Sequence, residues 1–335
     1  MILQRLLVRL LTMLVTLFGV AVVVFVVVRI APGDPIAMML PPGATDADID
    51  RLRALYGLDK SIFEQFVIWL GGVVQGDFGT SISLRQDVLS LVTNRLPATL
   101  ELAIAALIIA ILIGVPTAII GARERGRATE AGIDVANGAA LSIPDFLWGL
   151  LFILLFGVIW PIFEISGRVS PRLDLPFVTQ FYLFESIVRL RFDLTADLVS
   201  HMFMPALALA LPLAAIISQL LKQSLKELLS LDYVVLARVK GFSETQVILR
   251  EALKNAALPT LTLIGVQFTF LIGGTVIVER LFSYEGLGNM AIDAVVNRDL
   301  PLIQGIVLVF ALLFVLINLA VDMMYALLNP RLRHG

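Results

Sequence analysis

Six stretches of this chain, each about as long as a membrane-spanning helix, contain almost no charged residues. A helix needs about 20 predominantly apolar residues to cross a bilayer. The stretches are Leu10–Val28, Leu102–Ala122, Val135–Phe163, Leu198–Leu221, Asn255–Val278 and Leu300–Val321. A single run of this kind also occurs as a buried helix in soluble proteins. Six in one chain predict an all-α polytopic membrane protein with six transmembrane helices.

The composition agrees with this interpretation. Only 16% of the 335 residues are charged and 59% are hydrophobic, whereas soluble domains average about 25% charged residues. A net charge of −2 gives no support for nucleic-acid binding.

The first apolar stretch also has features of a secretory signal, because Arg5 and Arg9 precede it. Its apolar run is longer than the roughly 7–15 residues of a signal core, and no clear small-x-small cleavage site follows. We therefore expect residues 1–30 to form a retained first transmembrane helix.

Basic residues in the short segments between the stretches predict the orientation, since cytoplasmic loops carry an excess of Lys and Arg. With six spans, all of the following fall on one side: Arg5, Arg9, Arg123, Arg125, Arg127, Lys222, Lys226, Arg238, Lys240, Arg250, Lys254, Arg331 and Arg333. We therefore expect both termini to be cytoplasmic.

Residues 31–96 then form an extracytoplasmic loop with short amphipathic helices, and residues 97–335 form a core of five spans. One helical pattern runs from Thr45 to Gly57. A second begins at Ser61, where Ser61 and Glu64 have the spacing of a capping box. These helices either pack on their own protein or contact an external partner.

A charged insert at about 222–258 separates the fourth and fifth stretches. Leu220–Lys240 is rich in helix-forming residues, and Gly241 then interrupts the pattern. Ser243 and Gln246 have capping-box spacing, which predicts a second helix from Glu244. We therefore expect a helix–turn–helix, with Ala237 allowing close approach and Gly241 forming the sharp turn.

The second helix of the insert has two different sides. Its apolar side carries Ile248, Leu249, Ala252, Leu253 and Ala256, and its polar side carries Glu244, Arg250, Glu251 and Lys254. An ordinary solvated loop needs no apolar stripe, whereas a helix that docks into a groove of another protein does. Both interpretations remain open from these features alone.

Several kinds of chemistry are excluded or disfavoured. The chain has no cysteine, which excludes disulfides and thiolate metal sites, and only two histidines. No glycine is directly followed by lysine, so the phosphate-binding loop of Walker-type ATPases is missing. We predict no catalytic residue, no metal site and no cofactor bound by this chain, and a membrane enzyme is disfavoured.

Acidic residues in or near the spans are candidate functional groups. Asp145 lies within the third stretch, directly after Pro144, which should kink the helix. Asp145 either pairs with a neighbouring helix or freed backbone group, or faces a translocation path. Glu101 lies near the outer end of the second stretch and is expected at the membrane interface.

The insert also resembles a known family. Ala237-Arg238-Val239-Lys240-Gly241, followed by Ala252-Leu253-Lys254-Asn255-Ala256 and Pro259, is similar to the cytoplasmic coupling loop of ABC importer permeases of the dipeptide/oligopeptide branch. Val235 and Leu236 stand where the family pattern Glu-Ala-Ala-x-x-x-Gly has Glu and Ala.

The resemblance covers nearly the whole chain. Matching motifs, in order, are Arg29-Ile-Ala-Pro-Gly-Asp-Pro35, Gly76-Asp-Phe-Gly79, Leu96-Pro-Ala-Thr-Leu-Glu101, Ser142-Ile-Pro-Asp-Phe146, Val278-Glu-Arg-Leu-Phe-Ser-Tyr-Glu-Gly-Leu-Gly288, Arg298-Asp-Leu-Pro301 and Asn329-Pro-Arg331. Asp145 and Glu285 depart from the pattern, which has a small polar residue and a proline there.

The resemblance implies an ABC importer permease fold in a bacterial inner membrane. It implies a heterodimer with a second homologous permease, two cytoplasmic ATPase subunits that bind ATP and Mg, and an extracytoplasmic substrate-binding protein. The expected cargo is di- or oligopeptides, with nickel complexes, glutathione or another small solute as alternatives. The coupling-loop residues would be Ala237, Arg238, Lys240, Gly241, Glu244, Arg250 and Glu251. A stand-alone secondary transporter is the alternative from another class.

Overall fold

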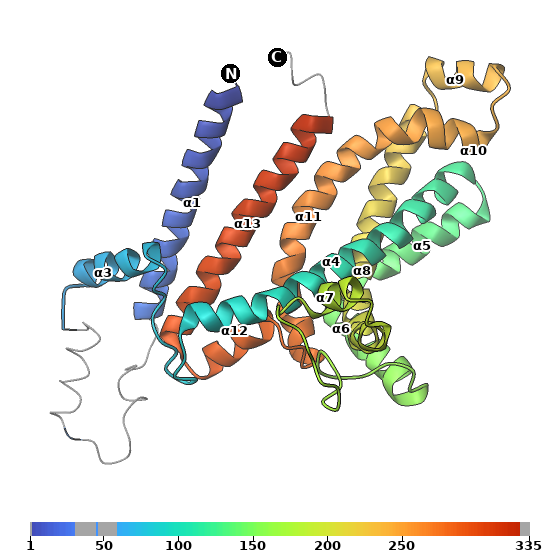
Figure 1. The fold of residues 1–335 in the computed structure, drawn as a ribbon. Coiled ribbons are helices and arrows are strands. Elements are labelled where there is room, and N and C mark those ends of the chain that lie inside the picture. Colours follow the sequence, from blue (N-terminus) through green and yellow to red (C-terminus); the bar gives the residue numbers. More distant parts are fainter. Residues whose placement is uncertain (1, 31–44, 46–58, 329–335) are drawn as a thin grey trace. The chain divides into compact units, whose positions relative to one another are not determined.

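The computed structural model describes residues 2–30, 45 and 59–328, and these are mostly helical (Figure 1). The helices are α1 (Ile2–Ile30), α3 (Ile62–Val74), α4 (Val88–Arg123), α5 (Ala128–Ser142), α6 (Asp145–Phe152), α7 (Tyr182–Val188), α8 (Phe192–Leu228), α9 (Asp232–Val239), α10 (Glu244–Gln246), α11 (Leu253–Leu281), α12 (Leu287–Val296) and α13 (Leu300–Leu328). Two π-helical segments, η1 (Ile153–Ile159) and η2 (Val247–Ala252), continue α6 and precede α11.

Five helical segments within the described residues are long and apolar enough to cross a membrane. They are Leu11–Ile30, Val88–Arg123, Phe192–Leu228, Glu244–Leu281 and Leu300–Met324. A sixth candidate is the pair formed by α5 and α6–η1, which is bent by 100°. The all-α polytopic fold is thus confirmed, with one stretch broken rather than continuous.

The break occurs at the predicted kink. Ile143 and Pro144 have extended ψ angles of 121° and 149°, so α5 ends at Ser142 and α6 starts anew at Asp145. Proline disfavours helical geometry in the residue before it and has no N–H to donate. The expected helix across Val135–Phe163 is therefore two shorter helices.

The chain forms two compact units, residues 1–96 with 290–315 and residues 97–289 with 316–335. In the first unit α3 packs on α1 through aromatic rings, with the Phe66 centroid 5.3 Å from that of Phe25. The predicted capping box is present, because Ser61 and Glu64 exchange hydrogen bonds at the start of α3. The predicted helix over Thr45–Gly57 and the motif at Asn329–Arg331 lie outside the described residues.

Asp299 organises another part of the first unit. Its Oδ2 accepts hydrogen bonds from Ser81 Oγ at 2.5 Å, from Ser83 N at 2.9 Å and from Ser83 Oγ at 2.7 Å. These bonds join the loop before α4 to the start of α13. They satisfy a carboxylate that is fully shielded from solvent.

In the second unit α8 is the central helix, and two thirds of the residues in its most apolar segment are buried. Its alanines permit close crossing by α4. A Cβ on Gly114 of α4 would lie 2.7 Å from the Ala214 carbonyl oxygen, so a larger residue does not fit there. Small residues at helix crossings are typical of membrane proteins.

The long loop before α8 folds onto α4. Arg168 Nη2 lies 2.8 Å from Glu101 Oε2 and also donates to the Gln180 carbonyl oxygen at 2.6 Å. The Arg168 guanidinium lies 4.0 Å from the Tyr182 ring centroid. Glu101 is only 7% exposed, so it is enclosed by protein instead of lying open at the interface as expected. The loop supplies the cation that allows this burial.

Candidate functional site

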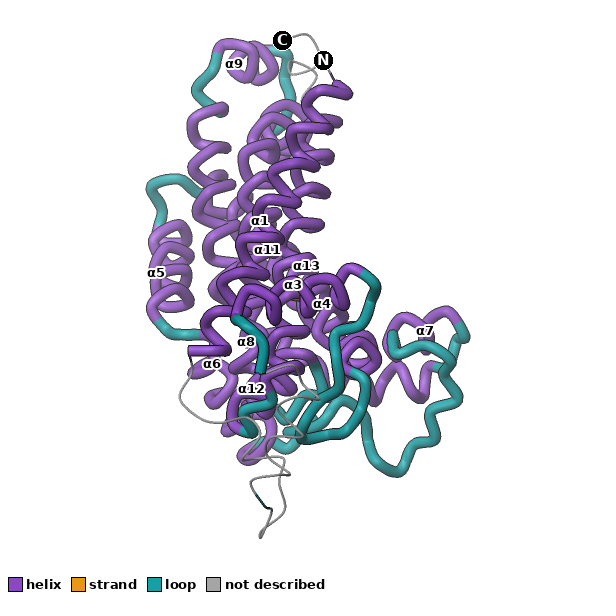
Figure 2. Tube along the Cα trace, turned by 90° about the vertical axis from the view of Figure 1, so that its left-hand side faces the viewer, coloured by secondary structure: helices purple, strands orange, loops and turns teal. Residues whose placement is uncertain are grey.

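The charged insert forms a helical hairpin at the end of the second unit where α8 ends (Figures 1 and 2). The predicted helix over Leu220–Lys240 is interrupted after Leu228. Leu231 N donates to the Leu228 carbonyl oxygen in a turn, and α9 begins at Asp232. Arg238 Nη1 donates to the Leu229 carbonyl oxygen at 3.1 Å, which satisfies a group freed by the break.

Gly241 forms the turn of the hairpin, as the sequence predicts. Its φ is +86°, a left-handed conformation that glycine adopts without steric cost. Gly241 N donates to the Arg238 carbonyl oxygen and Phe242 N to that of Ala237, which closes the C-terminus of α9.

The predicted capping box then starts the second helix at Glu244. Ser243 N donates to Gln246 Oε1 at 3.0 Å, and Gln246 N donates to Ser243 Oγ at 3.4 Å. Between the two arms, Val234, Ala237 and Val247 form a small buried cluster. Ala237 thus occupies the close approach that its size predicts.

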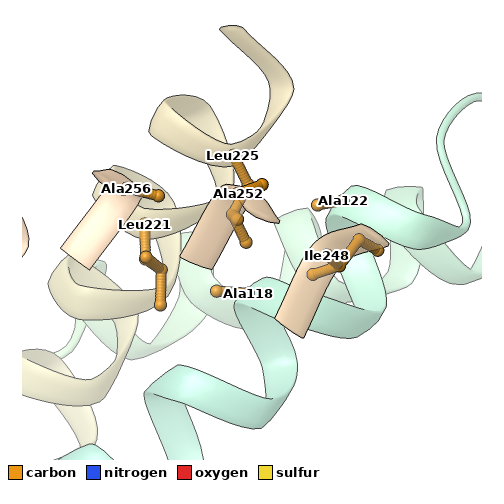
Figure 3. Packing of buried hydrophobic residues seen from close by; sticks show 7 residues of the cluster. All are labelled: Ala118, Ala122, Leu221, Leu225, Ile248, Ala252 and Ala256. Atoms are coloured by element: carbon orange, nitrogen blue, oxygen red, sulfur yellow. The ribbon is translucent and has the colours of Figure 1, made fainter. Parts of the chain in front are cut away.

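The apolar stripe of the second helix packs within its own chain. Ile248, Ala252 and Ala256 are buried against two small residues of α4 and two leucines of α8, and Figure 3 shows these side chains gathered where the elements meet. The four partners are Ala118, Ala122, Leu221 and Leu225. The interpretation of this stripe as a docking face for another protein is therefore wrong for these three residues.

The exposed apolar surface lies instead on and around α9. Leu236 is 53% exposed and Val239 is 79% exposed, and the apolar residues Leu231, Tyr233, Val235 and Phe242 on and beside α9 are exposed as well. Sequence reasoning missed this patch. The available signal was the pair Val235–Leu236, apolar residues on a helix otherwise expected to be solvated.

The charged residues of the insert are only partly brought together. Arg238 Nε lies 2.7 Å from Glu244 Oε1, with Arg238 Nη2 at 3.3 Å from Glu244 Oε2, so this pair bridges the turn. Lys240 and Arg250 are exposed, and Glu251 is half-buried. Arg250 and Glu251 lie on η2, away from that bridge in sequence.

Asp145 is the first residue of α6, and its side chain is half-buried. Its Oδ1 accepts a hydrogen bond from Phe146 N at 2.8 Å. A Cβ on Gly274 of α11 would lie 3.4 Å from Asp145 Oδ2, so the carboxylate faces a glycine of a neighbouring helix. The backbone bond matches the structural interpretation, and the path interpretation stays a prediction.

The apolar helices and the broken span are those of a multi-pass membrane protein. Residues 110–334 match the family described as "Binding-protein-dependent transport system inner membrane component". Residues 2–103 match its N-terminal companion, "Binding-prot-dependent transport system membrane comp, N-term". The chain therefore belongs to the binding-protein-dependent ABC importer permeases of the inner membrane, in the dipeptide/oligopeptide branch.

Similar proteins along nearly the full length have different cargo names. The dipeptide transport system permease protein DppB of Escherichia coli (strain K12) is 37% identical over 339 residues, covering 99% of both chains. The glutathione transport system permease protein GsiC of the same strain is 36% identical over 326 residues, covering 97% of both. The oligopeptide transport system permease protein AppB of Bacillus subtilis (strain 168) is 33% identical over 319 residues, covering 95% of both.

Proposed function

We propose that this chain forms half of the translocation path of an ATP-driven importer for di- or oligopeptides and couples to a separate ATPase through the α9 hairpin. The observation that carries the proposal is the exposed apolar patch on α9, whose opposite side is packed on its own hairpin. An exposed apolar helix at the end of a membrane bundle suits insertion into a groove of a partner.

The base of the hairpin is connected to three long helices, so a movement of the hairpin would reach all three. Its base is buried against α4 and α8 through Ile248, Ala252 and Ala256, and η2 continues directly into α11. A displacement of α9 by the ATPase would therefore act on the ends of three long helices together. Such a push changes the relative populations of inward-open and outward-open states if the ATPase contacts differ between them.

The coupling residues would have different roles. Ala237 and Gly241 set the close packing and the turn, and Arg238 with Glu244 fixes the angle between the arms. Lys240, Arg250 and Glu251 would supply charged contacts around the apolar patch. ATP and Mg would bind to the partner subunits, and this chain would hydrolyse none.

The proposed assembly has two homologous permeases, two cytoplasmic ATPases, an extracytoplasmic binding protein and surrounding lipid. The basic α4–α5 turn and the hairpin would lie in the cytoplasm with both termini. Peptide cargo is favoured because two of the similar permeases are named for dipeptides and oligopeptides, and the one named for glutathione keeps that tripeptide as the alternative. Asp145 would face the path.

The test places charged side chains in the exposed apolar patch of α9 and leaves the buried contacts of η2 and α11 unchanged. Leu236→Asp with Val239→Asp should reduce co-purification of the ATPase by roughly tenfold or more, about 1.4 kcal/mol per factor of ten. Val178→Asp is the control, because Val178 is 84% exposed and lies in the loop before α7, outside the hairpin. Equal retention of the ATPase in both variants would overturn the assignment of the contact to α9. Uptake of a labelled dipeptide by the complete transporter gives the functional readout.

A further inference from the structure

A cavity of about 310 Å³ lies between the α4–α5 turn, the end of α8 and the α9–α10 hairpin. This volume is at the lower end of the roughly 300–1,000 Å³ typical of small-ligand sites. Its polar lining is dominated by cations: Arg123, Arg125, Lys226 and Arg238, together with Ser230 and the single acid Glu244. The arrangement suits an anion.

The positive charge of this basic cavity is only partly neutralised. Glu244 is bound by Arg238 through two hydrogen bonds. Among the described residues Arg125 has no acidic partner within ion-pair distance.

The other two cations share their acids with residues outside the cavity. Lys226 pairs with Glu130, which also lies 3.7 Å from Lys222 Nζ. Arg123 lies 3.6 Å from Glu124, which also pairs with Arg127. Lys222 has its own close partner, Asp134. The surplus of N–H donors in the basic cavity therefore rests on Arg125 and on Arg123, whose acid Glu124 also pairs with Arg127.

The sequence positions of its lining residues place the basic cavity near the depth expected for lipid headgroups. Ala122 ends one uncharged stretch, and Lys226 comes five residues after Leu221, which ends another. At about 1.5 Å per residue this is roughly 7 Å beyond the apolar run. The headgroup region adds about 5–8 Å on each side of the hydrocarbon core.

The apolar part of the lining is suited to a lipid rather than to a free ion. Ala122, Leu229 and Ile248 line the same cavity as the cations. They offer a surface for the glycerol and first acyl carbons beside the charged groups. A carboxylate side chain of a protein partner would contact only the cations and would leave these apolar residues uncovered.

We propose that the basic cavity binds the phosphate of an anionic phospholipid. Basic pockets between helices near the membrane surface bind such headgroups. The bound phosphate would join the α4–α5 turn to the α9–α10 hairpin, so the lipid composition of the leaflet would influence the position of the hairpin. The proposal needs the membrane location but does not depend on peptide cargo.

The test measures lipid retained by the purified full chain in detergent, by native mass spectrometry, with phosphatidylglycerol and phosphatidylcholine added in titration. The double variant Arg123→Gln/Arg125→Gln should bind phosphatidylglycerol at least about tenfold more weakly, since two charged donors are removed. The control Arg250→Gln/Lys254→Gln removes the same charge at two exposed positions outside the lining and should stay within about twofold, because exposed charges contribute little. Binding is compared per folded protein, so that a difference in stability between the variants does not imitate a loss of lipid.

Other outcomes overturn the proposal. Equal binding of phosphatidylcholine would show that the anionic phosphate is not selected. Displacement of the lipid by inorganic phosphate at equal concentration would identify a soluble anion site instead. Loss of the bound lipid on assembly with the ATPase would assign the basic cavity to an acidic side chain of that partner.

Discussion

Arg168 and Glu101 form an ion pair of 2.8 Å in which the two side chains are 5% and 7% exposed. Glu101 belongs to α4 and Arg168 to the loop before α7, so the pair anchors this loop to a long apolar helix. Phe184 N also donates to Glu101 Oε1 at 3.0 Å. The loop is thus a folded part of the second unit.

Glu101→Gln should destabilise the protein strongly, because Arg168 would be left buried without its counter-charge. Loss of one partner of a buried pair typically costs about 3–5 kcal/mol. Thermal unfolding of the full chain in detergent measures this. Arg191→Gln is the control, since Arg191 and Asp193 are 42% and 59% exposed in their pair and such a pair contributes under about 1 kcal/mol.

A second variant separates charge from packing in the same pair. Glu101→Leu combined with Arg168→Met should recover most of the lost stability, because apolar replacement of both partners removes the unpaired charge. Equal losses in the single and double variants would show that the hydrogen bonds, rather than the charge balance, dominate.

Gly241→Ala should weaken coupling between ATP hydrolysis and uptake. A side chain at φ +86° costs about 1–2 kcal/mol in the left-handed region, so the hairpin turn would shift. Gly138→Ala is the matched control, because Gly138 lies in α5 with no atom within 4 Å of an added Cβ. Uptake per ATP hydrolysed should fall only for Gly241→Ala.

Charge reversal at Arg238 and Lys240 should reduce co-purification of the ATPase and uptake. Lys254→Glu, also on an exposed position of the insert, is the single-site control. The exchange Arg238→Glu/Glu244→Arg keeps the pair across the turn while moving the charges. Rescue by this exchange would assign the effect to the hairpin angle, and no rescue would assign it to contact with the partner.

Asp145→Asn tests the translocation path. If Asp145 faces the cargo, uptake of dipeptides with a free amino group should fall more than uptake of N-acetylated dipeptides, because only the former carry a cation. An equal fall for both, together with lower thermal stability, would support a structural role at the start of α6.

The stability of the loop around α7 should depend on acidic pH. Hydrogen bonds from Thr179 Oγ at 2.6 Å and Val178 N at 3.0 Å lower the pKa of Glu185 to about 2, with a smaller contribution from Arg189. The folded pKa is below the unfolded value of about 4.3. The contribution is therefore present above about pH 4.3 and is lost as the pH falls toward 2.

Glu185→Gln should flatten this dependence. The thermal midpoint of the full chain, measured between about pH 3 and pH 7, should fall less steeply at the acidic end in the variant than in the parent. Glu164→Gln, in the same loop, is the control for the loss of one carboxylate. Parallel curves for Glu185→Gln and the parent would contradict the role of Glu185.

Local sequence signals predicted much of this structure. The capping boxes at Ser61 and Ser243 and the turn at Gly241 each depend on a few neighbouring residues, and all three are present. The break at Pro144 also follows from the chemistry of one residue. Such features depend only on residues that are neighbours in the sequence, so the sequence alone is sufficient to predict them.

Features that depend on distant residues could not be read in the same way. Glu101 is buried because Arg168, in a separate loop, reaches it. The stripe at Ile248, Ala252 and Ala256 was correctly identified as apolar, but the helices that pack against it were not. Periodicity shows that one face of a helix is buried and does not show which element buries it. The same limit hid the exposed patch on α9.

The basic cavity also has a consequence for sidedness. Arg125, after α4, and Arg238, after α8, line one cavity and must therefore lie on the same side of the membrane. Between them the chain passes through the bent pair and then once through α8. A chain needs an even number of crossings to return to its starting side, so we predict that the bent pair crosses the membrane once. Because the chain has no cysteine, single cysteines introduced at each end of that pair would report opposite accessibility without background labelling.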